Sequence, residues 1–192
     1  IITSRIAHPA VLQPIEYLMK NEKIISHFVD IDKNGNIDYQ HLNSLLSKFE
    51  SNTLVSLMHA NNEIGIINDI KKIGEICKKN NAFFHSDAVQ TVCHYEIDLS
   101  EIYINSITAS AHKFHGPKGV GFIYLSDDTM IDPYIFGGGQ ERNMRAGTEN
   151  ISSILGMTKA FEIAYKNLEE ESKYIYSLKQ YMVEKLKNEF YG

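Results

Sequence analysis

The sequence predicts an α/β fold in which a mostly parallel sheet carries helices on both faces. Short apolar runs alternate with amphipathic stretches from Ile1 to Leu125. This alternation is typical of parallel strands joined by helices. After Ile151 the apolar residues recur only at helical spacing, so the chain is expected to end in helix.

The strands are predicted from apolar runs bounded by polar residues or glycine. Ile1–Ser4 is the first, and a helix is expected to follow from about Pro9, because proline suits the first turn of a helix. Pro14 is an awkward residue inside that helix, since it lacks the N–H that the helix hydrogen bond needs. The later predicted strands are Ile24–Val29, Thr53–Met58, Ala82–His85, Ser106–Ala109 and Val120–Leu125.

Helices between these strands are predicted from apolar spacing and capping residues. One apolar face is formed by Leu42, Leu45, Leu46 and Phe49. Asp69 is expected to open another helix, which ends near Asn80–Asn81. Beyond Ile151 no proline interrupts the pattern, so we expect one long helix or two in series, with an apolar stripe that packs on the core rather than in a coiled coil. The stripe includes Ile154, Met157, Phe161, Ala164, Leu168, Ile175, Leu178, Met182 and Leu186.

Charge and cysteine content restrict the class of protein. The chain has 24 acidic and 19 basic residues and a net charge of -5, which argues against a surface that coats nucleic acid. It has no apolar run long enough for a membrane helix and no start of the signal-peptide type. Cys77 and Cys93 have no metal-site spacing, and unpaired thiols fit a reducing compartment. Cys77 shares a helical face with Ile70 and Ile73, so it is expected to be buried. We expect a cytoplasmic protein without nucleic-acid or membrane partners, and an organellar location stays open.

Residues 30–41 are similar to a calcium-binding loop. The side chains that such a loop requires at its first, third, fifth and sixth positions are Asp30, Asp32, Asn34 and Gly35. The twelfth position, however, is His41, and an imidazole cannot supply the two carboxylate oxygens that calcium needs there. We therefore expect no metal, a tight turn at Asn34-Gly35 and a helix N-cap at Asp38.

An acidic and a basic side chain follow two of the predicted strands. Asp87 comes just after Ala82–His85, and Lys113 comes after Ser106–Ala109. Ligands of open α/β sheets bind at the carboxyl ends of the strands. Asp87 could cap a helix or act as the counter-ion of a cofactor. Lys113 could be a solvated loop lysine, a role that suits Lys118 better, or an amine that forms an imine once desolvation lowers its pKa.

Pyridoxal 5'-phosphate requires this pair of residues. A lysine binds its aldehyde covalently, and an aspartate keeps its pyridine nitrogen protonated so that the ring accepts electrons. Ser110 and the adjacent backbone could bind the phosphate oxygens. The sequence therefore predicts a pyridoxal-phosphate site built on Asp87 and Lys113.

Five segments carry a family resemblance. They are Ala-His-Pro-Ala-Val-Leu around His8, Met-His-Ala-Asn-Asn-Glu-Ile-Gly around Asn62, His-Ser-Asp-Ala-Val-Gln around Asp87, Ser-Ala-His-Lys-Phe-His-Gly-Pro-Lys-Gly around Lys113, and Gly-Gly-Gly-Gln-Glu-Arg-Asn-Met-Arg-Ala-Gly-Thr-Glu-Asn from Gly137. The chain resembles the class V aminotransferase group of pyridoxal-phosphate enzymes, and within it the cysteine desulfurases. The last segment is the most specific, because related transaminases share only the Asp and Lys pair. One departure is Ala7, where the family usually has Glu.

The resemblance implies an aspartate-aminotransferase-like large domain of fold type I. Residues 1–148 would form part of this cofactor-binding domain. Residues 149–192 would form the long linking helix and the start of a small C-terminal domain. The family's active site is shared across a homodimer.

The resemblance also implies catalytic roles. Lys113 would bind the cofactor, and His8 would stack on its ring and shuttle protons. Asn62 would bind the phenolic oxygen of the cofactor or the carboxylate of the substrate, while Asn61 suits a strand-end turn.

Four more residues are implied to bind the cofactor. Gln90 would contact the phenolic oxygen, and Ser110 and His112 would contact the phosphate. Thr148 would reach the phosphate of the neighbouring subunit, from the loop that also carries Arg142 and Arg145.

The implied activity is that of a cysteine desulfurase, a sulfurtransferase that converts L-cysteine to L-alanine. The sulfur would pass as a persulfide to an iron–sulfur scaffold or another acceptor protein. The family's catalytic cysteine and its substrate-carboxylate arginine are expected beyond Gly192, and its first phosphate loop before Ile1, so we expect a fragment. Two alternatives are another class V enzyme, such as an aminotransferase or a selenocysteine lyase, and a non-catalytic partner-binding module. The Asp87 and Lys113 pair argues against the last.

Overall fold

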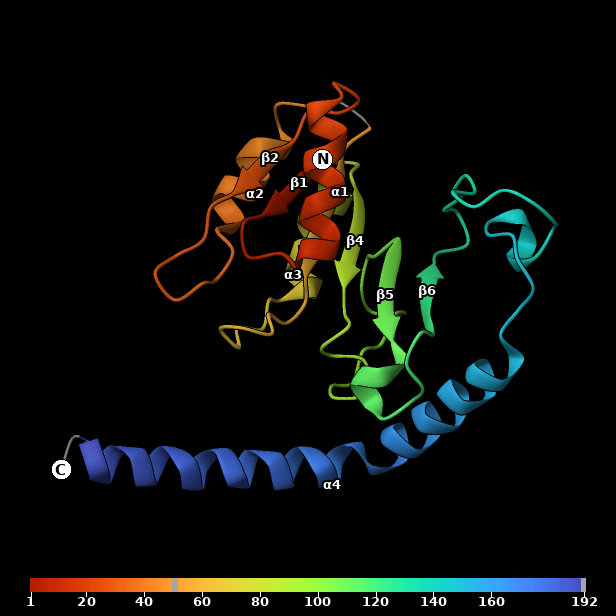
Figure 1. Cartoon of the computed structure of the whole chain (residues 1–192). Helices are drawn as coiled ribbons and strands as arrows, with labels where there is room; N and C mark the ends of the chain where they lie inside the picture. Colours follow the sequence, from red (N-terminus) through yellow and green to blue (C-terminus); the bar gives the residue numbers. More distant parts are fainter. Residues whose placement is uncertain (50–51, 191–192) are drawn as a thin grey trace.

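The computed structural model describes residues 1–49 and 52–190, and its strands form one sheet. The strands are β1 (Ile2–Ser4), β2 (His27–Val29), β3 (Leu54–Met58), β4 (Phe83–Asp87), β5 (Ser106–Ser110) and β6 (Gly121–Leu125). Their order is β2-β1-β3-β4-β5-β6, and every pairing is parallel except that of β5 with β6. The prediction of a mostly parallel sheet is confirmed (Figure 1).

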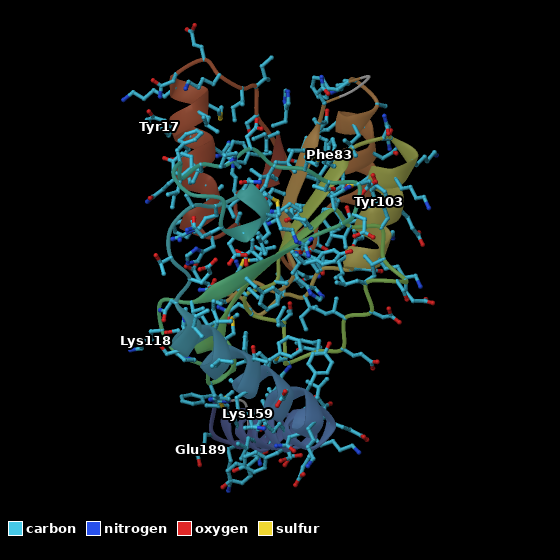
Figure 2. All side chains as sticks on the ribbon, turned by 90° about the vertical axis from the view of Figure 1, so that its right-hand side faces the viewer. Tyr17, Phe83, Tyr103, Lys118, Lys159 and Glu189 are labelled. Atoms are coloured by element: carbon cyan, nitrogen blue, oxygen red, sulfur yellow. The ribbon has the colours of Figure 1, made fainter. Side chains whose placement is uncertain are left out.

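Helices lie on both faces of this sheet, as predicted. The helices are α1 (Pro9–Lys20), α2 (Tyr39–Leu46), α3 (Ile70–Lys79) and α4 (Ile151–Phe190), with short 3-10 turns η1 (Ala111–Phe114) and η2 (Glu141–Asn143). Figure 2 shows α1, marked by Tyr17, on one side of the strands and α2 and α3 on the other, together with Tyr103. The main core is on the side of α2 and α3, where Leu42, Ile73 and Phe84 are fully buried.

Capping side chains determine where α2 and α3 begin. The Asp38 carboxylate accepts hydrogen bonds from the backbone N–H groups of Gln40 and His41 at the start of α2. The Asp69 carboxylate accepts one from Lys72 at the start of α3. Each bond satisfies a donor that the first helical turn leaves without a partner. Both N-caps are therefore confirmed, and α1 continues through Pro14.

The segment that is similar to a calcium loop forms contacts within the chain. The Asp32 carboxylate accepts hydrogen bonds from the backbone of Asn34 and Asn36 and from the Asn36 side chain. These bonds lower the pKa of Asp32. The Asp30 carboxylate lies 2.9 Å from His41 Nδ1, and Gly35 has a φ of 90°, in the left-handed region that glycine favours. The predicted tight turn is confirmed.

Several boundaries differ from the predictions. β2 begins only at His27, and α2 ends before Phe49. β4 extends to Asp87, which pairs in register with Met58 on one side and Thr108 on the other. The prediction that Asp87 lies past the strand is therefore wrong. In a sequence, polar residues at the end of a strand look like the start of a loop. In the fold, the strand continues as long as the two adjacent strands supply hydrogen-bond partners for its backbone.

The final segment is one helix, α4, and its two parts differ in environment. Phe161 packs edge-on against Phe114 with ring centroids 6.0 Å apart, and Ala164 is buried. Beyond it, Ile175, Leu178 and Leu186 are exposed, by 62%, 47% and 47%. Figure 1 shows this part of the helix extending away from the sheet. The expected packing of the apolar stripe on the core is thus confirmed only for the first part. Among the described residues, no helix has both the length and the apolar character of a membrane span.

Candidate functional site

A cavity of about 490 Å³ opens at the carboxyl ends of β3, β4 and β5. All but one of the residues that the sequence predicted for a cofactor site line it. They are His8, Asn62, Asp87, Gln90, Ser110, His112 and Lys113. Clefts of this volume hold small ligands and cofactors, and the ends of parallel strands are where open α/β sheets bind them. The fold thus brings side chains from distant parts of the sequence to one place.

Asp87 is a buried acidic residue at the end of β4. It is only 7% exposed, and its Oδ1 accepts a hydrogen bond from the backbone N–H of Val89 at 3.1 Å. The chain turns after Asp87 instead of forming a helix, so the interpretation of Asp87 as a helix N-cap is wrong. Within residues 1–49 and 52–190 its carboxylate forms no ion pair. A buried carboxylate without a cationic partner is suited to receive one from a ligand.

Lys113 is presented by η1, the tight turn that follows β5. Ala111 and Phe114, at the two ends of the turn, are buried at 0% and 1% exposure, which fixes the turn on the core. His112 and Lys113 between them are exposed and line the cavity. The expectation of a desolvated lysine is therefore not met by the described part of the chain. Lys113 and Asp87 nevertheless line the same cavity.

His94 holds the backbone of Lys113. Its Nε2 lies 2.8 Å from the Lys113 carbonyl oxygen, and a carbonyl only accepts hydrogen bonds, so Nε2 is the donor. This bond joins the turn after β4 to the turn after β5. No sequence pattern indicates His94, because a contact between residues 19 positions apart leaves no local signal.

His8 lies at the cavity as the N-cap of α1. Its Nδ1 accepts a hydrogen bond from the Ala10 backbone N–H at 3.1 Å. A neutral imidazole has one donor and one acceptor nitrogen, so the proton of a neutral His8 is on Nε2. His8 therefore combines a structural role with a ring that lines the cavity.

Two consecutive asparagines follow β3 and have different roles. The Asn61 side chain donates to the Ile6 carbonyl at 2.7 Å and accepts from the backbone N–H groups of Glu63 and Ile64. It holds the turn and ties it to the segment before α1, as the sequence suggested. Asn62 is exposed and lines the cavity, where its amide is available to a ligand.

Ser110 and Gln90 supply neutral polar groups to the cavity. Ser110 ends β5, and its hydroxyl does not cap η1 although it precedes that turn. Gln90 lies half-buried in the turn after β4. A hydroxyl, an amide and the His112 ring at one cavity can donate several hydrogen bonds to an anionic group.

Thr148 is the one predicted site residue that does not line this cavity. It is exposed, as are Arg142 and Arg145 in the same glycine-rich loop. An Arg145 guanidinium nitrogen donates to the neighbouring Ala146 carbonyl at 3.0 Å. The role of Thr148 toward a neighbouring subunit stays a prediction.

Both cysteines are buried away from this chemistry. Cys77 and Cys93 are 0% and 2% exposed, and burial raises their pKa values to about 12 and about 11. Because the thiolate is the reactive form, neither side chain suits a nucleophile at neutral pH. Cys93 also lies in a buried turn, where its φ is 65°, and not on an exposed loop.

We expect both thiols to react at least about 100-fold more slowly than free cysteine with a disulfide reagent at pH 8, because a raised pKa leaves little thiolate. The measurement is the rate of colour release from the folded protein. Urea should restore rapid reaction of both thiols. Rapid modification of Cys93 in the folded protein would contradict its burial.

Comparison with known proteins gives a consistent match. The aminotransferase class-V family model matches residues 1–190. Cysteine desulfurase IscS of Dictyoglomus turgidum is 43% identical over 183 residues, which are 95% of this chain and 46% of that protein. A NifS-like protein of known structure superposes with a TM-score of 0.91 at 39% identity, over 97% of this chain and 51% of that one. SspA, solved in complex with cysteine, superposes with a TM-score of 0.77 at 33% identity, over 84% and 46% of the two chains. The chain spans about half the length of the curated relatives it matches.

Proposed function

Because the chain belongs to the class-V aminotransferase family, we propose that it forms the cofactor-binding part of a pyridoxal-phosphate-dependent cysteine desulfurase. This enzyme would convert L-cysteine to L-alanine and pass the sulfur to an acceptor protein, such as an iron–sulfur scaffold. The observation that carries the proposal is that Asp87 and Lys113 line one cavity at the ends of adjacent strands. Relatives named as cysteine desulfurases support it.

The residues present fit pyridoxal phosphate. The cofactor has a basic ring nitrogen, an aldehyde and a phosphate, and the cavity offers a chemically matched group for each. The buried Asp87 carboxylate suits the ring nitrogen, and the Lys113 amine suits the aldehyde. Ser110 and His112 supply donors for the phosphate. When bound, the cofactor supplies a ring that accepts the electron pair released at the substrate Cα.

Each residue then has a defined task. The Asp87 carboxylate holds a proton on the ring nitrogen through a charge-assisted hydrogen bond in a buried site. Lys113 Nζ would hold the aldehyde of the cofactor, and its free amine could move a proton at the substrate Cα. His8 would pack on the cofactor ring, and Asn62 and Gln90 would hold its oxygen substituent.

Sulfur transfer requires a thiolate, and the described cysteines do not suit that role. Cys77 and Cys93 are buried, with raised pKa values. The sulfur-accepting cysteine of the proposed enzyme is therefore another one, in the part of the relatives that this chain does not span. In the proposed homodimer, Thr148, which is exposed and outside the cavity of its own chain, would hold the phosphate of the neighbouring site.

The full-length protein with added pyridoxal phosphate should release alanine from L-cysteine, with one sulfide for each alanine in the presence of a thiol reductant. Both products are measured over time, and Cys93→Ser should leave the rate unchanged. A keto acid in place of alanine would identify an aminotransferase. Turnover of L-selenocysteine but not of L-cysteine would identify a selenocysteine lyase. Loss of turnover in Cys93→Ser would show that the nucleophile lies in the described chain.

A further inference from the structure

His85 stands on the cavity side of β4, two residues before Asp87. Its Nδ1 lies 2.8 Å from Ser56 Oγ on β3, and its Nε2 lies 3.3 Å from Thr108 Oγ1 on β5. Alternate residues of a strand point to the same face, so the ring of His85 is on the same side of the sheet as the Asp87 carboxylate. Both residues line the cavity. One side chain thus connects three strands directly beside the buried acidic residue.

The register shows where this connection lies. Ser56 is the direct neighbour of His85 on β3. Thr108, in contrast, is the direct neighbour of Asp87 on β5, so His85 reaches diagonally forward to the residue that pairs with Asp87. The imidazole therefore lies across the sheet at the base of the Asp87 side chain, and it joins the strands on both sides of β4.

The hydrogen bonds of His85 are complete in its neutral form. A neutral imidazole has one donor and one acceptor, and each hydroxyl can take either part, so either tautomer satisfies both nitrogens. Burial lowers the pKa of His85, and the opposing effect of the Asp87 charge is smaller. The ring is therefore neutral at pH 7. An imidazolium at this position would act as the counter-ion of Asp87, whereas the neutral ring leaves the carboxylate charge to a ligand.

We propose that His85 is a positioning residue for Asp87. The His85 ring bridges Ser56 and Thr108, and this bridge holds the Asp87 carboxylate toward the cavity as the counter-ion of a bound cationic ring. This inference rests on the proposed pyridoxal-phosphate site and adds a residue to it. The polar contacts of His85 end at neutral hydroxyls. Asp87 keeps its negative charge for the ligand, and the bridge prevents β4 from shifting relative to β3 and β5 at this point.

The test uses the full-length protein and three variants. His85→Leu removes both hydrogen bonds at similar volume, and His85→Gln keeps a neutral donor and acceptor. Ser86→Ala is the matched control, because the Ser86 hydroxyl donates to the Leu57 carbonyl from the neighbouring position of the same strand, on the opposite face. Three quantities are measured: the cofactor dissociation constant, the pH midpoint of the visible absorbance of the bound cofactor, and the melting temperature.

We expect His85→Leu to weaken cofactor binding about tenfold, the factor that corresponds to the upper end of the net contribution of one hydrogen bond between neutral groups. The pH midpoint should rise. If the pyridine nitrogen is protonated less firmly, the cofactor ring withdraws fewer electrons, and the nitrogen that links the cofactor to Lys113 becomes more basic. His85→Gln should restore both values toward those of the wild type. Ser86→Ala should lower the melting temperature and leave the dissociation constant and the midpoint unchanged.

An unchanged dissociation constant and midpoint in His85→Leu would overturn the role of His85, as would equal shifts in Ser86→Ala. If His85→Leu does not fold, Thr108→Val removes the hydroxyl at one end of the bridge with little change in volume, and the same changes are expected. A wild-type protein that binds no pyridoxal phosphate would overturn the proposed function itself, and the role of His85 with it. If the wild type binds pyridoxal phosphate and His85→Leu has the same dissociation constant and pH midpoint, only the role of His85 is overturned.

Discussion

Replacement of Lys113 by arginine in the full-length protein is expected to abolish covalent attachment of pyridoxal phosphate. A guanidinium keeps the positive charge but does not form an imine with an aldehyde, because it stays protonated. Borohydride reduction and peptide mapping should label the peptide that contains Lys113 in the wild type and no peptide in Lys113→Arg. Turnover of L-cysteine should fall by about 10²–10⁴ or more, the range that a positioned acid–base group contributes.

The matched control is Lys118→Arg. Lys118 is exposed, lies five residues further along the same segment and does not line the cavity. This variant should keep both the label and the turnover. A label on Lys118 in the wild type, or an unchanged label in Lys113→Arg, would show that the cofactor-binding lysine has been misassigned.

Replacement of Asp87 by asparagine is expected to reduce turnover by about 10²–10⁴-fold, because removal of one partner from a buried ion pair, here the one proposed with the cofactor ring, costs about 3–5 kcal/mol. The amide has nearly the same shape, so the packing at the end of β4 should be kept. It lacks the charge that stabilises a protonated ring nitrogen. The measurement is kcat for alanine release, together with the absorbance spectrum of the bound cofactor.

Asp98→Asn is the control for Asp87→Asn. Asp98 is an exposed aspartate that accepts hydrogen bonds from the backbone and hydroxyl of Ser100. Its replacement should leave kcat and the spectrum unchanged. If Asp87→Asn kept a wild-type kcat, the ring nitrogen would not depend on Asp87, and the proposed function would lose its main support.

Much of the fold could be predicted because the sequence patterns that mark its helices and strands involve residues close together along the chain. The caps at Asp38 and Asp69 act on N–H groups two or three residues away. The apolar period in α3 likewise describes one helix face, and it correctly placed Cys77 in the core. Local signals also predicted all six strands, although the limits of each differ from the expected ones, by three residues at the start of β2 and by one or two residues elsewhere.

The site was predicted in its residues and only partly in its geometry. The sequence motifs identified Asp87 and Lys113 as candidate site residues. They did not show that Asp87 is paired within the sheet or that Lys113 is exposed. His85 and Thr108 were missed. Polar residues at every second position of two adjacent strands could have revealed them, because such a pattern indicates a polar face on a sheet.

The sequence by itself determined the alternation of strands and helices, the caps and the identity of the residues that suit a pyridoxal-phosphate site, because each depends on side-chain chemistry or on neighbours along the chain. Only the tertiary structure decided that β6 runs antiparallel to β5, that the apolar stripe of α4 leaves the core after Ala164, and that His85 bridges two strands beside Asp87. These features depend on the register between strands and on which surfaces meet, and no local pattern of residues encodes either.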